Sequence, residues 1–224
     1  MRKFLKDNSL GVVFGGLFLV VLAAQAYAGH ATFNQRQLTE GLPPISLGRY
    51  LTSASFGADV AENWQSEYLQ FFLYLILTVF LLQKGSPESK QLGESGLESD
   101  KEQKVGRHAD ENSPAWARTG GWRTRVFSNS LGLVMGLIFL ASWSAQSIAG
   151  VAAFNEEQLA DLQDPVTWSQ YLTEPDFWNR TLQNWQSELL AVASFAILAI
   201  YLRQRGSPQS KPVGTAHTAT GIEG

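Results

Sequence analysis

A long segment occurs twice in this chain of 224 residues, and the duplication limits the folds available to it. Residues 8–90 align with residues 129–211 at a constant offset, without an insertion or deletion, and about 37 of the paired positions are identical. Internal similarity at a fixed spacing indicates a repeated structural unit. Each copy contains two strongly apolar runs, so the repeated unit is expected to be a helical hairpin.

The first apolar run of each copy is long enough to cross a membrane. Residues 10–29 and 131–151 carry no charged side chain. A helix of about 20 residues spans a hydrocarbon core of roughly 30 Å. Transmembrane helices are therefore predicted over about 10–29 and 131–151.

The second apolar runs, residues 68–82 and 189–202, are shorter. They reach spanning length only when the polar turn before each is included, which predicts helices over about 64–83 and 185–204. No alternation of period two suggests strands. The fold class predicted is an all-α membrane protein with four transmembrane helices, arranged as two tandem helical hairpins.

Positive charges predict the orientation of these hairpins. Between the paired runs the only Lys or Arg residues are Arg36, Arg49 and Arg180, whereas the other 14 lie before, between and after the copies. The positive-inside rule then places both termini and the central connection in the cytoplasm. Since each copy holds an even number of helices, both hairpins are expected to have the same orientation.

The same patterns predict four regions. A first hairpin repeat (1–90) is followed by a flexible cytoplasmic linker (91–121), a second hairpin repeat (122–211) and a disordered cytoplasmic tail (212–224). The linker and tail lack an apolar period and are rich in charged, Gly and Ser residues. The outer connections within the repeats are too long for tight turns and are expected to contain short interfacial helices.

The N-terminus also resembles a secretory signal, with Ala26-Tyr27-Ala28 before Gly29 as a cleavage site. The second copy argues against cleavage, because it carries the matching helix in the middle of the chain. A signal peptide cannot operate there. The first helix is therefore expected to remain as part of the hairpin.

Glycines recur on one face of the first helix in each copy. Gly11 and Gly15 match Gly132 and Gly136, and glycines four residues apart allow helices to approach closely in lipid. This face is expected to pack against protein. The alternative is that glycine is merely common in membrane helices.

Six polar residues near the outer helix ends form the candidate site. Gln25 and Gln146 lie on the first helices of the hairpins, and the second helices carry Asn63, Glu67, Asn184 and Glu188 at matching positions. A hydrogen bond from Gln25 to Glu67 or Asn63 is expected to close the hairpin. An alternative role for Glu67 and Glu188 is to bind a cation or a proton in the bundle interior. Trp64 and Trp185 are expected to be interfacial anchors.

The residue inventory excludes several kinds of chemistry. The chain has no Cys and only three His, namely His30, His108 and His217. Neither a metal site nor a haem is predicted, no glycine-rich phosphate loop occurs, and no catalytic triad is recognisable. We therefore expect no cofactor, no catalytic residue and no nucleic-acid partner. The expected partners are the lipid bilayer and either a second copy or another membrane protein.

The motifs shared by the two copies resemble an uncharacterised family of bacterial integral membrane proteins, a domain of unknown function. They include Asn-Ser-Leu-Gly at Asn8, Phe33-Asn34, Asn63-Trp64-Gln65-Ser66-Glu67 and Gly85-Ser86-Pro87 followed by Ser89-Lys90. The resemblance covers both repeats but not the linker. It implies a multi-pass protein of the bacterial inner membrane and implies no activity.

Two functional classes follow from these expectations. The favoured one is a non-enzymatic scaffold or assembly component of the cell envelope, which uses the glycine faces and the outer loops for contacts. The alternative is a small solute or ion transporter or channel built around Gln25, Glu67, Gln146 and Glu188.

Overall fold

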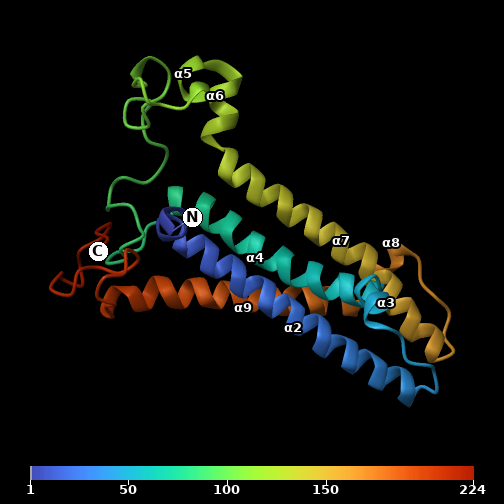
Figure 1. Ribbon diagram of the computed structural model, residues 1–224. Helices are drawn as coiled ribbons and strands as arrows, with labels where there is room; N and C mark the ends of the chain where they lie inside the picture. The colour runs from blue at the N-terminus through green and yellow to red at the C-terminus, as the bar shows by residue number, and fades with distance from the viewer. Residues whose placement is uncertain (1) are drawn as a thin grey trace. The chain divides into compact units, whose positions relative to one another are not determined.

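The computed structural model describes residues 2–224, and within that range all regular secondary structure is helical (Figure 1). The elements are α1 (Arg2–Asp7), α2 (Ser9–Thr39), α3 (Leu47–Leu51), α4 (Ala54–Phe80), the 3₁₀ helix η1 (Gly106–His108), α5 (Ala115–Thr119), α6 (Gly121–Ser128), α7 (Ser130–Ala160), α8 (Trp168–Tyr171) and α9 (Pro175–Tyr201). The all-α prediction is confirmed.

The four long helices extend further at their predicted outer ends than the apolar runs indicate. α2 and α7 continue about ten residues beyond 29 and 151, and α4 and α9 begin about ten residues before 64 and 185. α9 starts with proline at its first position and an aspartate in its first turn, both of which favour a helix start. Hydropathy identifies only the apolar part of each helix, whereas the helix itself continues through the flanking polar residues.

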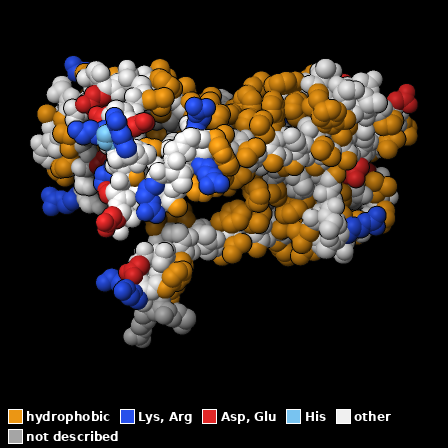
Figure 2. Space-filling view, turned by 90° about the horizontal axis from the view of Figure 1, so that it is seen from above, with side chains coloured by type: hydrophobic (Ala, Val, Ile, Leu, Met, Phe, Trp, Pro, Cys, Tyr) orange, Lys and Arg blue, Asp and Glu red, His pale blue; other side chains and the backbone are white. Residues whose placement is uncertain are grey.

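Two of the four helices, α2 and α7, are long and apolar enough to span a membrane. The expectation of four spanning helices is therefore supported for these two alone. α4 and α9 fall short by composition, because their first halves carry charged side chains such as Glu62, Arg180 and Glu188. The large apolar side chains of α2 and α7 are mostly exposed rather than packed in a core. Figure 2 shows broad hydrophobic areas on one face of the molecule.

The chain divides into two compact units, and each combines segments of both copies. The first unit contains the chain up to Ala61 together with Ala145–Glu174, and the second contains Glu62–Ser144 and Pro175–Gly224. The first unit thus holds α2, α3 and α8 with the beginning of α4 and the end of α7. The second holds most of α4, the connection between the copies, the first half of α7, α9 and the C-terminal segment.

In the first unit, one Asn in each copy fixes the connection that follows its helix. Asn155 Oδ1 accepts a hydrogen bond from Val166 N at 2.8 Å, and its Nδ2 donates to Val166 O at 2.9 Å. Asn34 makes the same two bonds with Ile45, at 2.8 and 3.0 Å. Each side chain satisfies both polar groups of one residue in the connection, so the chain returns along the helix at a defined point.

A buried tyrosine then packs against a helix glycine in each copy. Tyr171 is 1% exposed, and a Cβ added to Gly150 would lie 2.6 Å from its hydroxyl oxygen. Tyr50 meets Gly29 in the same way. The absence of a side chain at these glycines therefore lets α3 and α8 approach the helices that precede them.

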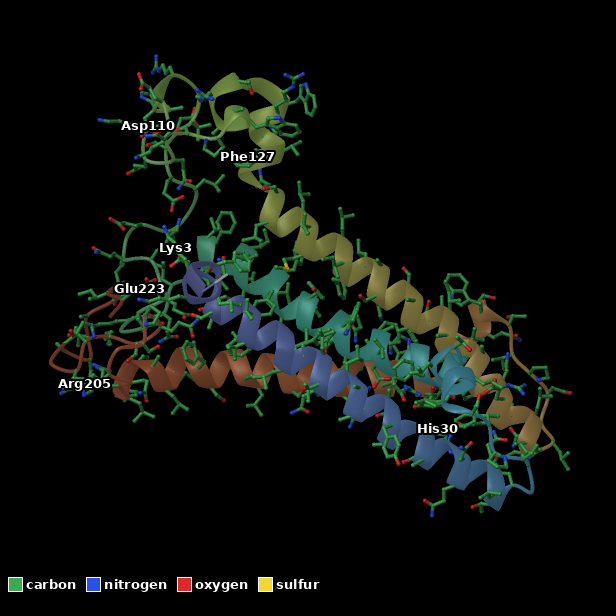
Figure 3. The ribbon with its side chains drawn as sticks, viewed as in Figure 1. Lys3, His30, Asp110, Phe127, Arg205 and Glu223 are labelled. Atoms are coloured by element: carbon green, nitrogen blue, oxygen red, sulfur yellow. The ribbon has the colours of Figure 1, made fainter. Side chains whose placement is uncertain are left out.

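In the second unit, the C-terminal segment lies against the end of the first copy, although its composition predicts disorder. Lys211 is 1% exposed, and its Nζ donates to the carbonyl oxygens of Gly85 at 2.6 Å and His217 at 2.9 Å, with Ala216 and Ala219 at 3.3 and 3.2 Å. Figure 3 labels Glu223 in this segment and Arg205 in the chain just beyond the end of α9. Four carbonyl oxygens surround one ammonium and hold this polar segment in place. Amino-acid composition does not indicate such contacts.

The connection between the copies is also ordered in part by a lysine. Lys90 Nζ donates to Gly96 O at 2.6 Å and forms an ion pair with Glu98. Further along, the rings of Trp116 and Trp122 meet edge to face, with their centroids 5.9 Å apart. The segment predicted as a flexible linker thus contains η1 and α5 between well-defined turns.

We predict that Lys211→Met will release the C-terminal segment. Burial lowers the pKa of Lys211, and the charge of Arg203 lowers it further, so the ammonium is held by the carbonyl oxygens against a desolvation cost. Without the ammonium, these carbonyls lose their common donor. Hydrogen exchange of residues 212–221 should become faster. Lys84→Met, at an exposed lysine four residues into the corresponding loop of the first copy, is the control and should leave exchange unchanged.

We also predict that Gly150→Ala will destabilise the protein by about 1–3 kcal/mol, because the new methyl group overlaps the buried Tyr171 ring. Denaturant unfolding in detergent would measure the change. Gly48→Ala is the matched control, since Gly48 is also helical but has no atom within 4 Å of the added Cβ. Equal effects of the two substitutions would contradict the packing argument.

Candidate functional site

A charged network connects α4 and α9 within the second unit. The Nε of Arg180 lies 2.5 Å from Glu62 Oε2, and Asn184 Nδ2 donates to Glu62 Oε1 at 2.8 Å. The Glu62 side chain is only 16% exposed, so a missing partner would leave a poorly solvated carboxylate. Both carboxylate oxygens are occupied, which gives the network a structural role.

The sequence analysis did not single out Glu62 or Arg180, although a signal was present. Arg180 is one of three cations between the apolar runs, and the equivalent position of the first copy is Asp59. A change of charge sign between equivalent positions of a duplicated chain suggests that these positions meet a charged partner. Asn184, by contrast, was predicted as a site residue, and the structure makes it part of this network.

Next to the network, Trp185 makes a specific hydrogen bond. Its Nε1 donates to Gln65 Oε1 at 2.7 Å, and Gln65 is fully buried. An interfacial anchor would instead present this N–H to headgroups. Trp64, the equivalent of Trp185, is 41% exposed and stays a candidate anchor. The two copies therefore use the same tryptophan position differently.

Trp185 also belongs to an aromatic cluster formed by α7 and α9. The Trp143 ring stacks on Phe139 and Phe177, with centroids 5.7 and 6.2 Å apart, and meets Trp178 and Trp185 at 6.2 and 5.7 Å. Pairs of this geometry each stabilise by about 0.5–1.5 kcal/mol beyond their buried area. The cluster is dense packing beside the polar network, and it was not predicted because its members are far apart in the sequence.

The remaining candidate polar residues are divided between the two units. Gln25 and Gln146 belong to the first unit, where Gln146 is 1% exposed and Gln25 is half-buried. Asn63 and Glu67 belong to the second unit, in which Glu67 is exposed. The hydrogen bond expected from Gln25 to Asn63 or Glu67 stays a prediction.

Glu67 and Glu188 lie on α4 and α9 within the same unit. The negative charge of Glu67 acts on Glu188, so the two carboxylates are within electrostatic reach of each other. Contacts from Glu62 to Asn184 and from Gln65 to Trp185 show that the two helices run in the same direction (Figure 1). This parallel packing is what brings equivalent residues of the two copies together.

The two glycine faces have different surroundings. A Cβ added to Gly136 would lie 3.1 Å from Phe72 Cε2, and one added to Gly132 would lie 3.4 Å from Ile76 Cδ1. In the second unit the glycine face of α7 therefore contacts α4. Within the described part of the first unit, no atom lies within 4 Å of a Cβ added to Gly11 or Gly15.

Within residues 2–224, no group of three or more His, Asp or Glu side chains is placed to hold a metal ion. The arrangement consists instead of paired charges, buried amides and stacked rings. No curated protein and no solved structure matches the sequence. The model of one protein family does match, over residues 1–222, and this chain belongs to that family, which is described as a domain of unknown function, DUF6766.

Proposed function

We propose that this chain is a multi-pass protein of the bacterial inner membrane with four spanning helices and both termini in the cytoplasm. The exposed apolar surfaces of α2 and α7 support this proposal. α7 lies in the middle of the chain, so a signal sequence does not account for it. It is also too exposed to be the core helix of a protein in water.

The packing of α4 supports its inclusion in the membrane despite its lower hydropathy. Phe72 and Ile76 lie against Gly136 and Gly132, which are within the apolar part of α7. A helix in contact with this part of a spanning helix lies at the same depth in the hydrocarbon. α9 adjoins the same two helices through Trp185, so one side of its polar first half packs on protein, and Arg180 and Asn184 on that half pair with Glu62 of α4.

Within this membrane assignment, we propose a non-enzymatic scaffold or assembly component of the cell envelope. The observation that supports the scaffold proposal is that residues shared by the two copies make structural contacts. Asn34 and Asn155 fix the connections, Gly29 and Gly150 accommodate tyrosines, and none of these contacts forms a reaction centre. Gly11 and Gly15 offer a face for another membrane helix, either of a second copy or of a different protein.

A conductor of small solutes or ions is the second candidate. Two observations favour it. Glu67 and Glu188 are within electrostatic reach of each other, and Gln65 Nε2 is buried without a hydrogen-bond acceptor among residues 2–224. A buried donor without an acceptor and two neighbouring carboxylates, all on α4 and α9, are features found along polar pathways, and intramembrane carboxylates often serve ion or proton transfer.

The topology is testable because the chain contains no cysteine. Single substitutions Pro44→Cys and Glu94→Cys place one thiol in the first outer connection and one in the central connection. An impermeant maleimide added to intact cells should label the first variant only. Labelling of Glu94→Cys before cell lysis would exclude the proposed orientation.

The two functional candidates differ in what purified protein does in sealed liposomes. The scaffold predicts no protein-dependent flux of alkali cations, protons or small neutral solutes. The conductor predicts a flux that falls at least about tenfold in Glu67→Gln/Glu188→Gln, because the carboxylates would bind the moving cation. Arg36→Gln/Glu157→Gln, which alters an exposed pair, serves as the control. A flux that is the same in both double variants would reject the carboxylate pathway.

A further inference from the structure

An open cleft of about 670 Å³ lies within the first unit and has no assigned role. Its walls are the end of α2, the following connection with α3, and the end of α7. Sites for small molecules commonly have volumes of roughly 300–1,000 Å³. The cleft is therefore large enough for a metabolite or a lipid headgroup, and it combines both copies of the repeat.

The charges that line this cleft are only partly paired. Arg36 and Glu157, from α2 and α7, form an ion pair across it. Three further charged residues line the cleft, namely Arg49 on α3, Glu40 at the end of α2 and Glu156 on α7. Within residues 2–224 their side chains make no hydrogen bond or ion pair. The cleft thus offers one free cation and two free carboxylates on different walls.

Glu156 is not simply a fully hydrated surface carboxylate. The side chains of Glu156, Glu40 and Arg49 are all exposed, but the wall of the cleft removes part of the water from the Glu156 carboxyl, and this desolvation, together with the charge of Glu157, raises its pKa. Partial removal from water without a partner costs free energy, which a bound cation would offset. Phe33 and Leu42 line the same cleft and supply apolar surface. A ligand with an ammonium group could contact a carboxylate and an aromatic face together.

We propose that this cleft binds a zwitterion that carries an ammonium group and a phosphate or carboxylate group. The ammonium pairs with Glu156, with Glu40 nearby, and the anionic group pairs with the planar guanidinium of Arg49. A ligand with a single charge would leave either Arg49 or Glu156 unpaired, so a zwitterion is preferred. Such a ligand is available as a free solute or as a phospholipid headgroup of the ethanolamine type.

The test uses the full-length protein in a nonionic detergent and calorimetric titration with phosphoethanolamine. Ethylamine and methyl phosphate serve as probes with one charge each. Phosphoethanolamine should bind at least about tenfold more tightly than either, and Arg49→Gln and Glu156→Gln should each weaken it at least about tenfold. Asp161→Asn, an exposed acidic position one turn further along the chain, is the control and should bind as the parent does.

Equal affinity for the three probes, or affinity unchanged in both Arg49→Gln and Glu156→Gln, would overturn the proposal. Loss of binding in Asp161→Asn as well would also overturn it, because the effect would then follow total charge rather than the cleft. The result does not depend on the scaffold function, since a conductor or a scaffold could hold the same ligand.

A second titration distinguishes the two sources of the zwitterion. The protein is placed in nanodiscs of phosphatidylglycerol alone or of phosphatidylglycerol with phosphatidylethanolamine. Weaker binding of phosphoethanolamine in the mixed nanodiscs would identify the lipid headgroup as the occupant, because the lipid competes for the cleft. Equal binding in both would identify a free solute. Absence of binding in both would reject the site.

Discussion

The apolar surface of α2 and α7 is the constraint on which the rest of the structure depends. Most large side chains along these helices are exposed, which water would not tolerate over such an area. In the membrane that we propose for this chain, the bilayer removes this cost, but it also forces every backbone polar group in the hydrocarbon to find a partner within the protein. Helices satisfy this requirement by themselves, so a long helix is the structure that such a segment can adopt.

Within the proposed membrane assignment, packing between α4 and α7 depends on small residues rather than on hydrophobicity. Lipid chains are as apolar as leucine, so burial alone does not favour contact between membrane helices. Gly132 and Gly136 allow Phe72 and Ile76 to approach α7 closely, and many atom contacts replace the missing hydrophobic effect. Gly150 and Gly29 do the same for Tyr171 and Tyr50 at the helix ends.

In two identical copies, equivalent positions would carry charges of the same sign. The second copy differs from the first at two such positions. Arg36 and Glu157 are at equivalent positions of the two copies and pair with each other. Two identical charges would repel at such a contact. Asp59 and Arg180 are likewise equivalent and opposite in sign, and Arg180 pairs with Glu62. Divergence of charge at these positions thus gives Arg36 and Arg180 each an acidic partner in the other copy.

The amino-acid sequence by itself determined the helical class, the duplication, the apolar segments and the glycine face that meets α4. Each is encoded locally, in the order of residues along one helix or in the similarity between two segments. The tertiary structure alone decided the Glu62–Arg180 pair, the Trp143 cluster and the four carbonyls around Lys211. Their partners are separated by tens of residues or more, and only the packing of parallel and antiparallel helices brings them together. It also places Lys211 against carbonyl oxygens of Gly85 and His217, a contact between distant segments that polar composition does not indicate.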